Sequence, residues 1–191
     1  MRRATRKVRT RVFPDPAAAW THTAVELDSL LEDVFMRWAE VAPRSWRLGE
    51  LVAGQLIADA ERLRSALDAL LENAVKYTLA SAEIELRTRS DGMSRVVIEI
   101  EDEGCGVPDQ ALGRIFDRFA RADSARTRSA GGVGLGLAIV DAIAKAHGGA
   151  CTVKSTPRGS VFALCLPNFV PARTPDPAPA PVLVKPSRIT P

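Results

Sequence analysis

The sequence predicts a single α/β domain in which amphipathic helices pack on a sheet. Three segments space their apolar residues as one face of a helix, and two others alternate apolar and polar residues as the strands of a hairpin do. The chain has 191 residues, of which 46% are hydrophobic and 26% charged. This size and composition suit one soluble domain and exclude a disordered or fibrous protein.

Two leucine-rich stripes predict the first two helices. The apolar residues of segment 27–38 recur at helical spacing, and Pro43 marks the stop. The second helix is expected to begin after Asp59, which is a suitable N-cap, and to end near Tyr77. Its leucine stripe is expected to face the sheet.

Polar residues gather at the far end of this second helix. At roughly 100° per residue, Glu72, Asn73 and Lys76 share an arc turned away from the leucine stripe. Oxygen ligands beside a lysine suit magnesium phosphate, because Mg²⁺ keeps waters and takes few protein ligands. We expect Asn73 to bind the metal directly and Glu72 to act through a water or on the incoming nucleophile, while Lys76 neutralises phosphate. A solvated helix face is the alternative.

A predicted hairpin ends on a candidate ligand for a purine. Segments 84–88 and 96–101 alternate, and Asp102 continues the core-facing row of the second strand, so burial is expected. Gly104 and Gly106 leave the adjacent backbone open to a flat ligand. A carboxylate can accept from the exocyclic amine of adenine but not from the carbonyl of guanine. Asp102 is therefore expected to select adenine, with a plain turn acid as the alternative.

A glycine cluster at 131–136 precedes the third helix. The unpaired N–H groups and the dipole of a helix N-terminus favour an anion, although a lone glycine cluster is often only a turn. Neither a Rossmann fingerprint nor a Walker loop is present. The remaining elements are expected to be a short helix at 109–119, a loop at 120–130, a helix at 135–147, and strands near 150–155 and 160–166.

The two ends differ from the body in composition. We expect a basic disordered tail at 1–23, the folded domain at 24–167 and a Pro/Ala-rich disordered tail at 168–191. No aromatic residues interleave with the N-terminal arginines, so no nucleic-acid partner is expected. No apolar run approaches the roughly twenty residues of a membrane span.

Cysteine and histidine usage points to neither a disulfide framework nor a phosphoacceptor. Cys105, Cys151 and Cys165 show no CxxC spacing, which fits a reducing cytoplasm, and Cys105 is expected to be accessible. His22 lacks the flanking acid and proline of a phosphoacceptor. His147 is expected to act at a helix C-terminus as a structural cation.

In this order, these motifs resemble the catalytic and ATP-binding domain of sensor histidine kinases, within the superfamily that also holds gyrase, a heat-shock chaperone and mismatch-repair ATPases (GHKL). The resemblance spans roughly residues 25–167. Its N box corresponds to 72–77, its two glycine boxes to 102–106 and 132–137, and its F box to 115–119. The F box favours the histidine kinase branch.

The resemblance implies a Bergerat-type fold, a two-layer α/β sandwich with a mixed sheet and helices on one face. It also implies ATP and Mg²⁺ as cofactors, under a lid at about 120–130. Glu72 and Lys76 would be catalytic. The residues implied in nucleotide binding are Asn73, Tyr77, Asp102, Gly104, Gly106, Phe116, Arg121, Gly132, Gly134, Leu135, Gly136 and Leu137.

The implied function is a protein histidine kinase that needs a partner. Members of this family carry a phosphoacceptor histidine in a dimerisation domain before the ATPase domain, and we find no such histidine here. We expect a cytoplasmic monomer that phosphorylates a separate dimerisation protein, for relay to a response regulator, with membrane contact only through a partner. The alternative is an ATP-sensing, anti-sigma-like interaction module that transfers nothing or phosphorylates serine.

Overall fold

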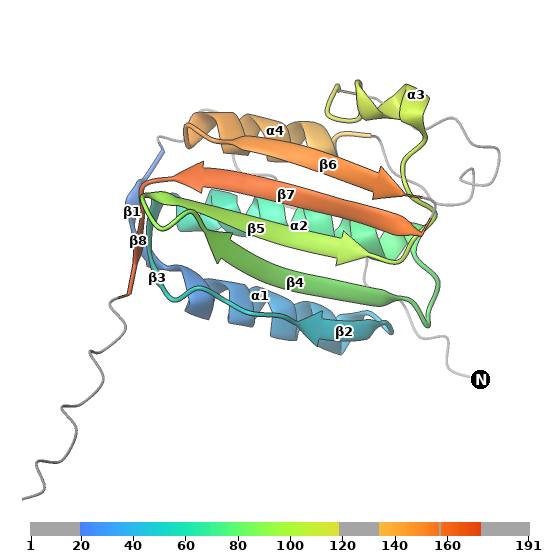
Figure 1. Ribbon diagram of the computed structural model, residues 1–191, viewed down its shortest axis with the longest axis horizontal. Coiled ribbons are helices and arrows are strands. Elements are labelled where there is room, and N and C mark those ends of the chain that lie inside the picture. The colour runs from blue at the N-terminus through green and yellow to red at the C-terminus, as the bar shows by residue number, and fades with distance from the viewer. Residues whose placement is uncertain (1–19, 119–133, 157, 173–191) are drawn as a thin grey trace, which may run out of the picture.

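A five-stranded mixed sheet forms one layer of the computed structural model, which describes residues 20–118, 134–156 and 158–172 (Figure 1). The two strands at one edge of this sheet run parallel to each other, and every other neighbouring pair is antiparallel. In the described ranges, the helices that pack on this sheet lie on one of its faces, as the resemblance implies. In spatial order the strands are β2 (Ser45–Leu48), β4 (Glu83–Ser90), β5 (Arg95–Asp102), β7 (Gly159–Pro167) and β6 (Ala150–Thr156).

Within the described residues, the second layer consists of α1 (Leu27–Val41), α2 (Ala60–Tyr77) and α4 (Gly136–Ala146). The central helix, α2, begins where the sequence predicts, because the Asp59 side chain accepts the N–H of Arg62 at 3.1 Å. The leucine stripe of α2 is buried, which confirms the predicted orientation of the helix. The buried members of this stripe are Leu63, Ala66, Leu67, Leu70, Leu71 and Ala74.

Truncation of this stripe is expected to cost stability. Leu67 is fully buried, so Leu67→Ala should lower the free energy of unfolding by about 2–5 kcal/mol, through lost transfer energy and the cavity left behind. Urea denaturation measures the change. As a control, Met36→Ala on α1, where the side chain is 57% exposed, should change it by less than about 0.5 kcal/mol.

A second, three-stranded antiparallel sheet was not predicted. It consists of β1 (Thr23–Glu26), β3 (Gly54–Ala58) and β8 (Phe169–Pro171), with β3 in the middle. Phe169 is 1% exposed and belongs to the main core. The folded body therefore continues past residue 167, where the Pro/Ala-rich composition predicts a tail. At the other end, the Thr21 N–H already donates to Asp59 at 3.1 Å, before residue 24.

The helix predicted at 109–119 is much shorter in the structure. α3 covers only Asp109–Leu112. The residues after it are joined by bonds from Arg114 N–H to Ala111 O and from Asp117 N–H to Arg114 O. These i→i+3 bonds make successive turns, and Gly113 at the junction disfavours helix propagation.

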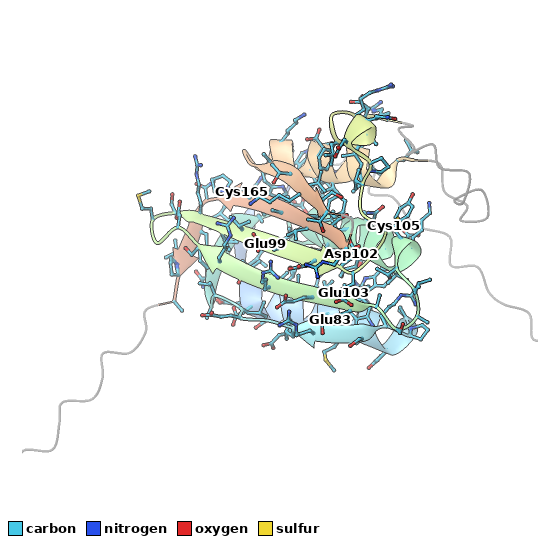
Figure 2. The ribbon with its side chains drawn as sticks, turned by 45° about the vertical axis from the view of Figure 1, so that its right-hand side comes forward. Glu83, Glu99, Asp102, Glu103, Cys105 and Cys165 are labelled. Carbon is cyan, nitrogen blue, oxygen red and sulfur yellow. The ribbon has the colours of Figure 1, made fainter. Side chains whose placement is uncertain are left out.

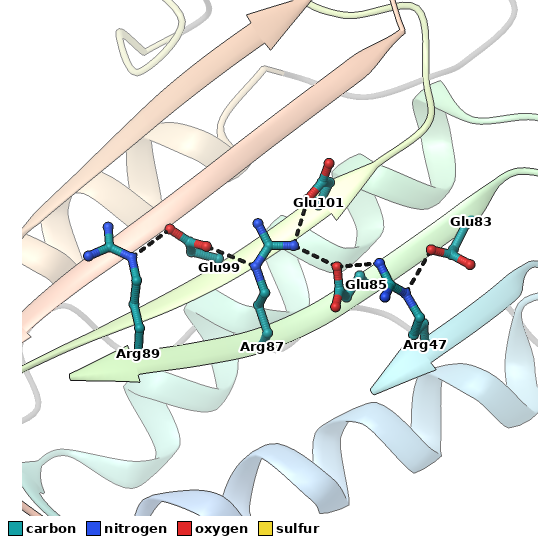
Figure 3. Close-up of polar contacts among 7 residues, drawn as sticks. All are labelled: Arg47, Glu83, Glu85, Arg87, Arg89, Glu99 and Glu101. Atoms are coloured by element: carbon teal, nitrogen blue, oxygen red, sulfur yellow. Dashed lines mark hydrogen bonds and ion pairs between the residues drawn. The ribbon is translucent and has the colours of Figure 1, made fainter. Parts of the chain in front are cut away.

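The sheet face opposite the helices is largely polar. Glu99 lies on this face, as does Cys165 (Figure 2). Arginine and glutamate side chains alternate across β2, β4 and β5, and each charge meets an opposite one (Figure 3). Arg87 bonds Glu99 at 3.0 Å and Glu101 at 2.6 Å, for example. The hydrophobic core lies on the other face of the sheet, between the strands and the helices.

Several expectations concern residues outside the described ranges. They are the lid at 120–130, the positions Arg121 and Gly132, most of the N-terminal tail and most of the C-terminal one. Among the residues that the structure does describe, no helix combines the length and the apolarity needed to cross a bilayer.

Candidate functional site

The last turns of α2 present the predicted polar cluster. Glu72, Asn73, Lys76 and Tyr77 are all partly exposed, while Leu71 before them and Ala74 among them are buried. The buried stripe therefore fixes the direction in which the polar residues point. The Lys76 ammonium lies 5.2 Å from the centre of the Tyr77 ring, close enough for a cation–π contact.

Asp102 ends β5 as a buried acid, as its parity predicts. It is 4% exposed, and one carboxylate oxygen accepts the N–H of Gly104 at 2.9 Å. Burial raises the pKa of Asp102 to about 6, against the opposing effect of N–H groups of Gly104 and Ser160. These N–H groups hold the carboxylate in a fixed position. Its two oxygens can accept further hydrogen bonds, as binding to a ligand amine requires.

A glycine brings this acid and the end of α2 together. A Cβ atom at Gly104 would lie 2.7 Å from the backbone oxygen of Tyr77 and 2.5 Å from the Asp102 carboxylate. Only a residue without a side chain lets the loop close this tightly on the helix. Asp102 and Cys105 lie at the same end of the sheet (Figure 2).

The next part of this loop packs against the β6–β7 hairpin. Gly106 has φ +69°, and a Cβ there would collide with the backbone oxygen of Thr156. The Val107 N–H donates to the hydroxyl of Ser155 at 2.5 Å. The loop after Asp102 is therefore held from both sides, by α2 and by the hairpin. Cys105 within it is exposed, as expected.

The N-terminus of α4 lies beside α2. Gly134 has φ +72° and Leu135 is the N-cap residue, whose side chain makes no capping bond. A Cβ at Gly136 would sit 3.9 Å from that of Ala69 on α2. The first N–H groups of this eleven-residue helix, which have no acceptor within the helix itself, thus lie next to the α2 surface.

Phe116 and Leu137 are partly buried and pack against the core. Phe116 follows α3, in the series of turns, and Leu137 is in the first turn of α4. Contact of each with a nucleotide stays a prediction. Arg121 and Gly132, the other two residues expected to bind it, lie outside the described residues.

His147 has a structural role, but not as the expected cation. It is 7% exposed, its Nε2 accepts the N–H of Asp59 at 3.0 Å, and its Nδ1 lies 2.8 Å from the oxygen of Ile143. An Nε2 that accepts a hydrogen bond carries no proton, so the ring is neutral, with its proton on Nδ1. His147 joins the end of α4 to the start of α2.

Two residues that hold the site were missed. Ser155 supports the loop after Asp102, and Arg44 donates to oxygens at the end of α2, including that of Val75 at 2.7 Å. Both act on partners more than thirty positions away in the chain. No local pattern could have signalled either residue.

The raised pKa of Asp102 predicts how ligand binding depends on pH. An ionised carboxylate accepts from an amine, so affinity for adenosine, which has no titrating phosphate, should fall as the pH drops through about 6. At pH 5 it should be about tenfold weaker than at pH 7. NMR titration measures this affinity, and an unchanged affinity at pH 5 would contradict the assignment.

Stability should depend on pH in the opposite sense. The pKa of Asp102 is above its usual value of 3.8. The contribution of this group to the free energy of unfolding is therefore fully present below pH 3.8 and is lost as the pH rises through about 6. Urea denaturation at several pH values measures it. In Asp102→Asn this part of the pH profile should be absent.

Residues 58–169 match the model of the family described as histidine kinase-, DNA gyrase B- and HSP90-like ATPases. The chain is 44% identical over 100 residues to the sensor histidine kinase YkoH of Bacillus subtilis, covering 52% of this chain and 21% of that protein. It is 44% identical over 109 residues to the probable sensor histidine kinase TcrY of Mycobacterium tuberculosis, covering 57% of this chain and 23% of that protein. The chain thus spans under a quarter of each of these relatives.

Solved structures with a similar fold include those of two further proteins. The mycobacterial sensor histidine kinase MprB is similar with a TM-score of 0.71 and 28% identity, over 78% of this chain and 100% of that one. Full-length ShkA in complex with AMPPNP is similar with a TM-score of 0.66 and 31% identity, over 82% of this chain and 33% of that one.

Proposed function

The chain belongs to the family of histidine kinase-, DNA gyrase B- and HSP90-like ATPases, and we propose that it binds Mg-ATP and transfers the γ-phosphoryl group to a histidine of a partner. Its relatives include sensor histidine kinases. Their activity is the model for this proposal. A need for ATP also favours a cytoplasmic location.

The close approach of Gly104 to the Tyr77 oxygen, which leaves no room for a Cβ atom, carries the proposal. It joins the acid that would read adenine to the helix face that would hold the metal and phosphates. Asp102 would accept from the adenine amine, and the bare backbone at Gly104 and Gly106 would let the ring lie close. The two ends of one nucleotide are thus assigned to two neighbouring elements.

The residues of α2 fit a magnesium phosphate. The amide oxygen of Asn73 is a hard oxygen donor of the kind that Mg²⁺ prefers when phosphates and waters complete its shell, and the carboxylate of Glu72, at the preceding helical position, would reach the metal only through a water. When bound, the metal would neutralise phosphate charge. Glu72 would orient the attacking imidazole and take its proton, while Lys76 and Tyr77 would border the site.

The N-terminus of α4 would take the phosphates. Gly134, Leu135 and Gly136 turn the backbone into the helix, where free N–H groups and the dipole favour an anion. Leu137 would anchor this turn on the core, and Phe116 would border the nucleotide. Gly132 and Arg121 would contribute from outside the described residues.

The acceptor histidine is assigned to a partner segment or protein. Of the two histidines in the sequence, His147 is buried with both ring nitrogens engaged, and His22 packs beside it with ring centres 5.2 Å apart. Both lie by the start of α2, whereas the proposed site lies at its end. A monomeric chain would therefore dock on a helical dimerisation partner, which passes the group to a response regulator.

Transfer can be tested directly. The chain is incubated with γ-labelled ATP and candidate histidine-bearing helical-hairpin proteins. Label on the partner that is lost in acid and kept in alkali is expected, since phosphohistidine has this stability. Acid-stable label, or none on any partner, would contradict histidine transfer.

A further inference from the structure

Arg44 lies in the turn between α1 and β2 and reaches the end of α2. Its Nε donates to the Thr78 hydroxyl at 2.9 Å. Its Nη2 donates to the oxygens of Val75 at 2.7 Å and Thr78 at 3.1 Å. A fourth bond, from Nη1 to the oxygen of Pro43 at 2.8 Å, fixes the guanidinium to its own turn. One side chain thus holds the last turn of the helix at three oxygens.

These bonds replace an ordinary helix stop. Helices often end on a glycine in the left-handed conformation, which satisfies the last carbonyls. The C-cap of α2 is Thr78, with extended backbone angles, and its hydroxyl donates to the oxygen of Ala74 at 2.8 Å. Arg44 meets the carbonyl of Val75 in the last turn and that of the C-cap Thr78, and a cation there also suits the helix dipole.

The held turn is also the surface against which the adenine-reading loop closes. Tyr77, whose oxygen abuts Gly104, lies between Val75 and Thr78, the two residues whose oxygens Arg44 binds. Gly104 in turn donates to Asp102. A shift of this turn would therefore change the distance between Asp102 and the Asn73 face of α2.

We propose that Arg44 is a positioning residue for Mg-ATP, acting through the end of α2. It touches no part of the nucleotide and sets the spacing between the adenine end and the metal end of the site. This inference rests on the proposed function, because it concerns the same site. Its signature is selective: a ligand that spans both ends depends on the spacing, whereas a ligand that fills only the adenine end does not.

The test compares two ligands, Mg-ATP and adenosine, on the wild-type chain and on Arg44→Met. Mg-ATP binding is expected to weaken about tenfold in the variant, as for the loss of a hydrogen bond to a charged group. Adenosine binding, measured by NMR titration, should change by less than about threefold. The ratio of the two affinities is the readout, because partial unfolding lowers both apparent affinities equally.

The matched control is Arg37→Met. Arg37 on α1 also pairs with a residue of α2, Asp68 at 2.5 Å, but in the middle of the helix and not at its end. Its loss should leave the affinity ratio unchanged. Arg44→Lys keeps the charge but lacks the planar guanidinium, so an intermediate affinity ratio is expected. If Arg44→Met does not fold, Arg44→Lys replaces it in the comparison.

The outcomes separate the two proposals. A wild-type ratio in folded Arg44→Met, or an equal loss for both ligands, overturns the positioning role and leaves the proposed function standing. Failure of the wild-type chain to bind Mg-ATP overturns the proposed function, and the role of Arg44 with it.

Discussion

Asp102→Asn is expected to weaken ATP binding about 100-fold. The Asp102 carboxylate is 4% exposed and already accepts the N–H of Gly104 with one oxygen. In the variant, the amide oxygen must keep that bond, so the amide NH₂ would face the adenine amine, donor against donor. A buried donor without an acceptor costs its desolvation energy. Titration calorimetry with Mg-ATP measures the loss.

The control for this variant is its neighbour. Glu101→Gln changes a carboxylate to an amide at the preceding position, on the opposite face of β5, where Glu101 bonds Arg87 at 2.6 Å. Its ATP affinity should stay within about twofold of the wild type, as for a surface substitution. Equal affinities of Asp102→Asn and Glu101→Gln for ATP would show that Asp102 does not bind the purine.

Glu72→Gln is expected to separate binding from transfer. As a general base, Glu72 would contribute to the transfer step and little to nucleotide affinity, so the phosphorylation rate of the partner should fall about 100- to 10,000-fold. The Kd for ATP should stay within about threefold. Single-turnover transfer from labelled ATP, with the nucleotide saturating, gives the rate.

Glu61→Gln is the matched control for this rate. Glu61 is an exposed glutamate in the first turn of the same helix, far from the proposed site. Its rate should equal that of the wild type. A Glu72→Gln variant that transfers at the wild-type rate would remove Glu72 from the chemistry, and one that loses ATP binding would make it a binding residue instead.

Periodicity predicted the parts of the fold that bury a continuous stripe. The leucines of α2 and the alternation of β5 each give a repeating signal, so the outward face of Asn73 and the burial of Asp102 followed from position alone. Asp59 was predicted as the N-cap of α2 from residue type and position, and the capping bond confirms it.

The rest depends on contacts between distant parts of the chain. β1, β3 and β8 are three to five residues long, too short for an alternation to stand out, and they form only because they pair with one another. Phe169 is buried although its neighbours in the sequence are those of a proline-rich tail. Arg44 acquires its role only when the turn before β2 meets the end of α2, 34 positions later.

The central claim is that one site binds a magnesium–adenine nucleotide, with Asp102 choosing the base. Titration calorimetry of the wild-type chain with Mg-ATP and, separately, with Mg-GTP tests it most directly. We predict saturable one-site binding of Mg-ATP and at least about 100-fold weaker binding of Mg-GTP, because the guanine carbonyl would oppose the Asp102 carboxylate. No heat with Mg-ATP, or equal affinity for the two nucleotides, would contradict the account.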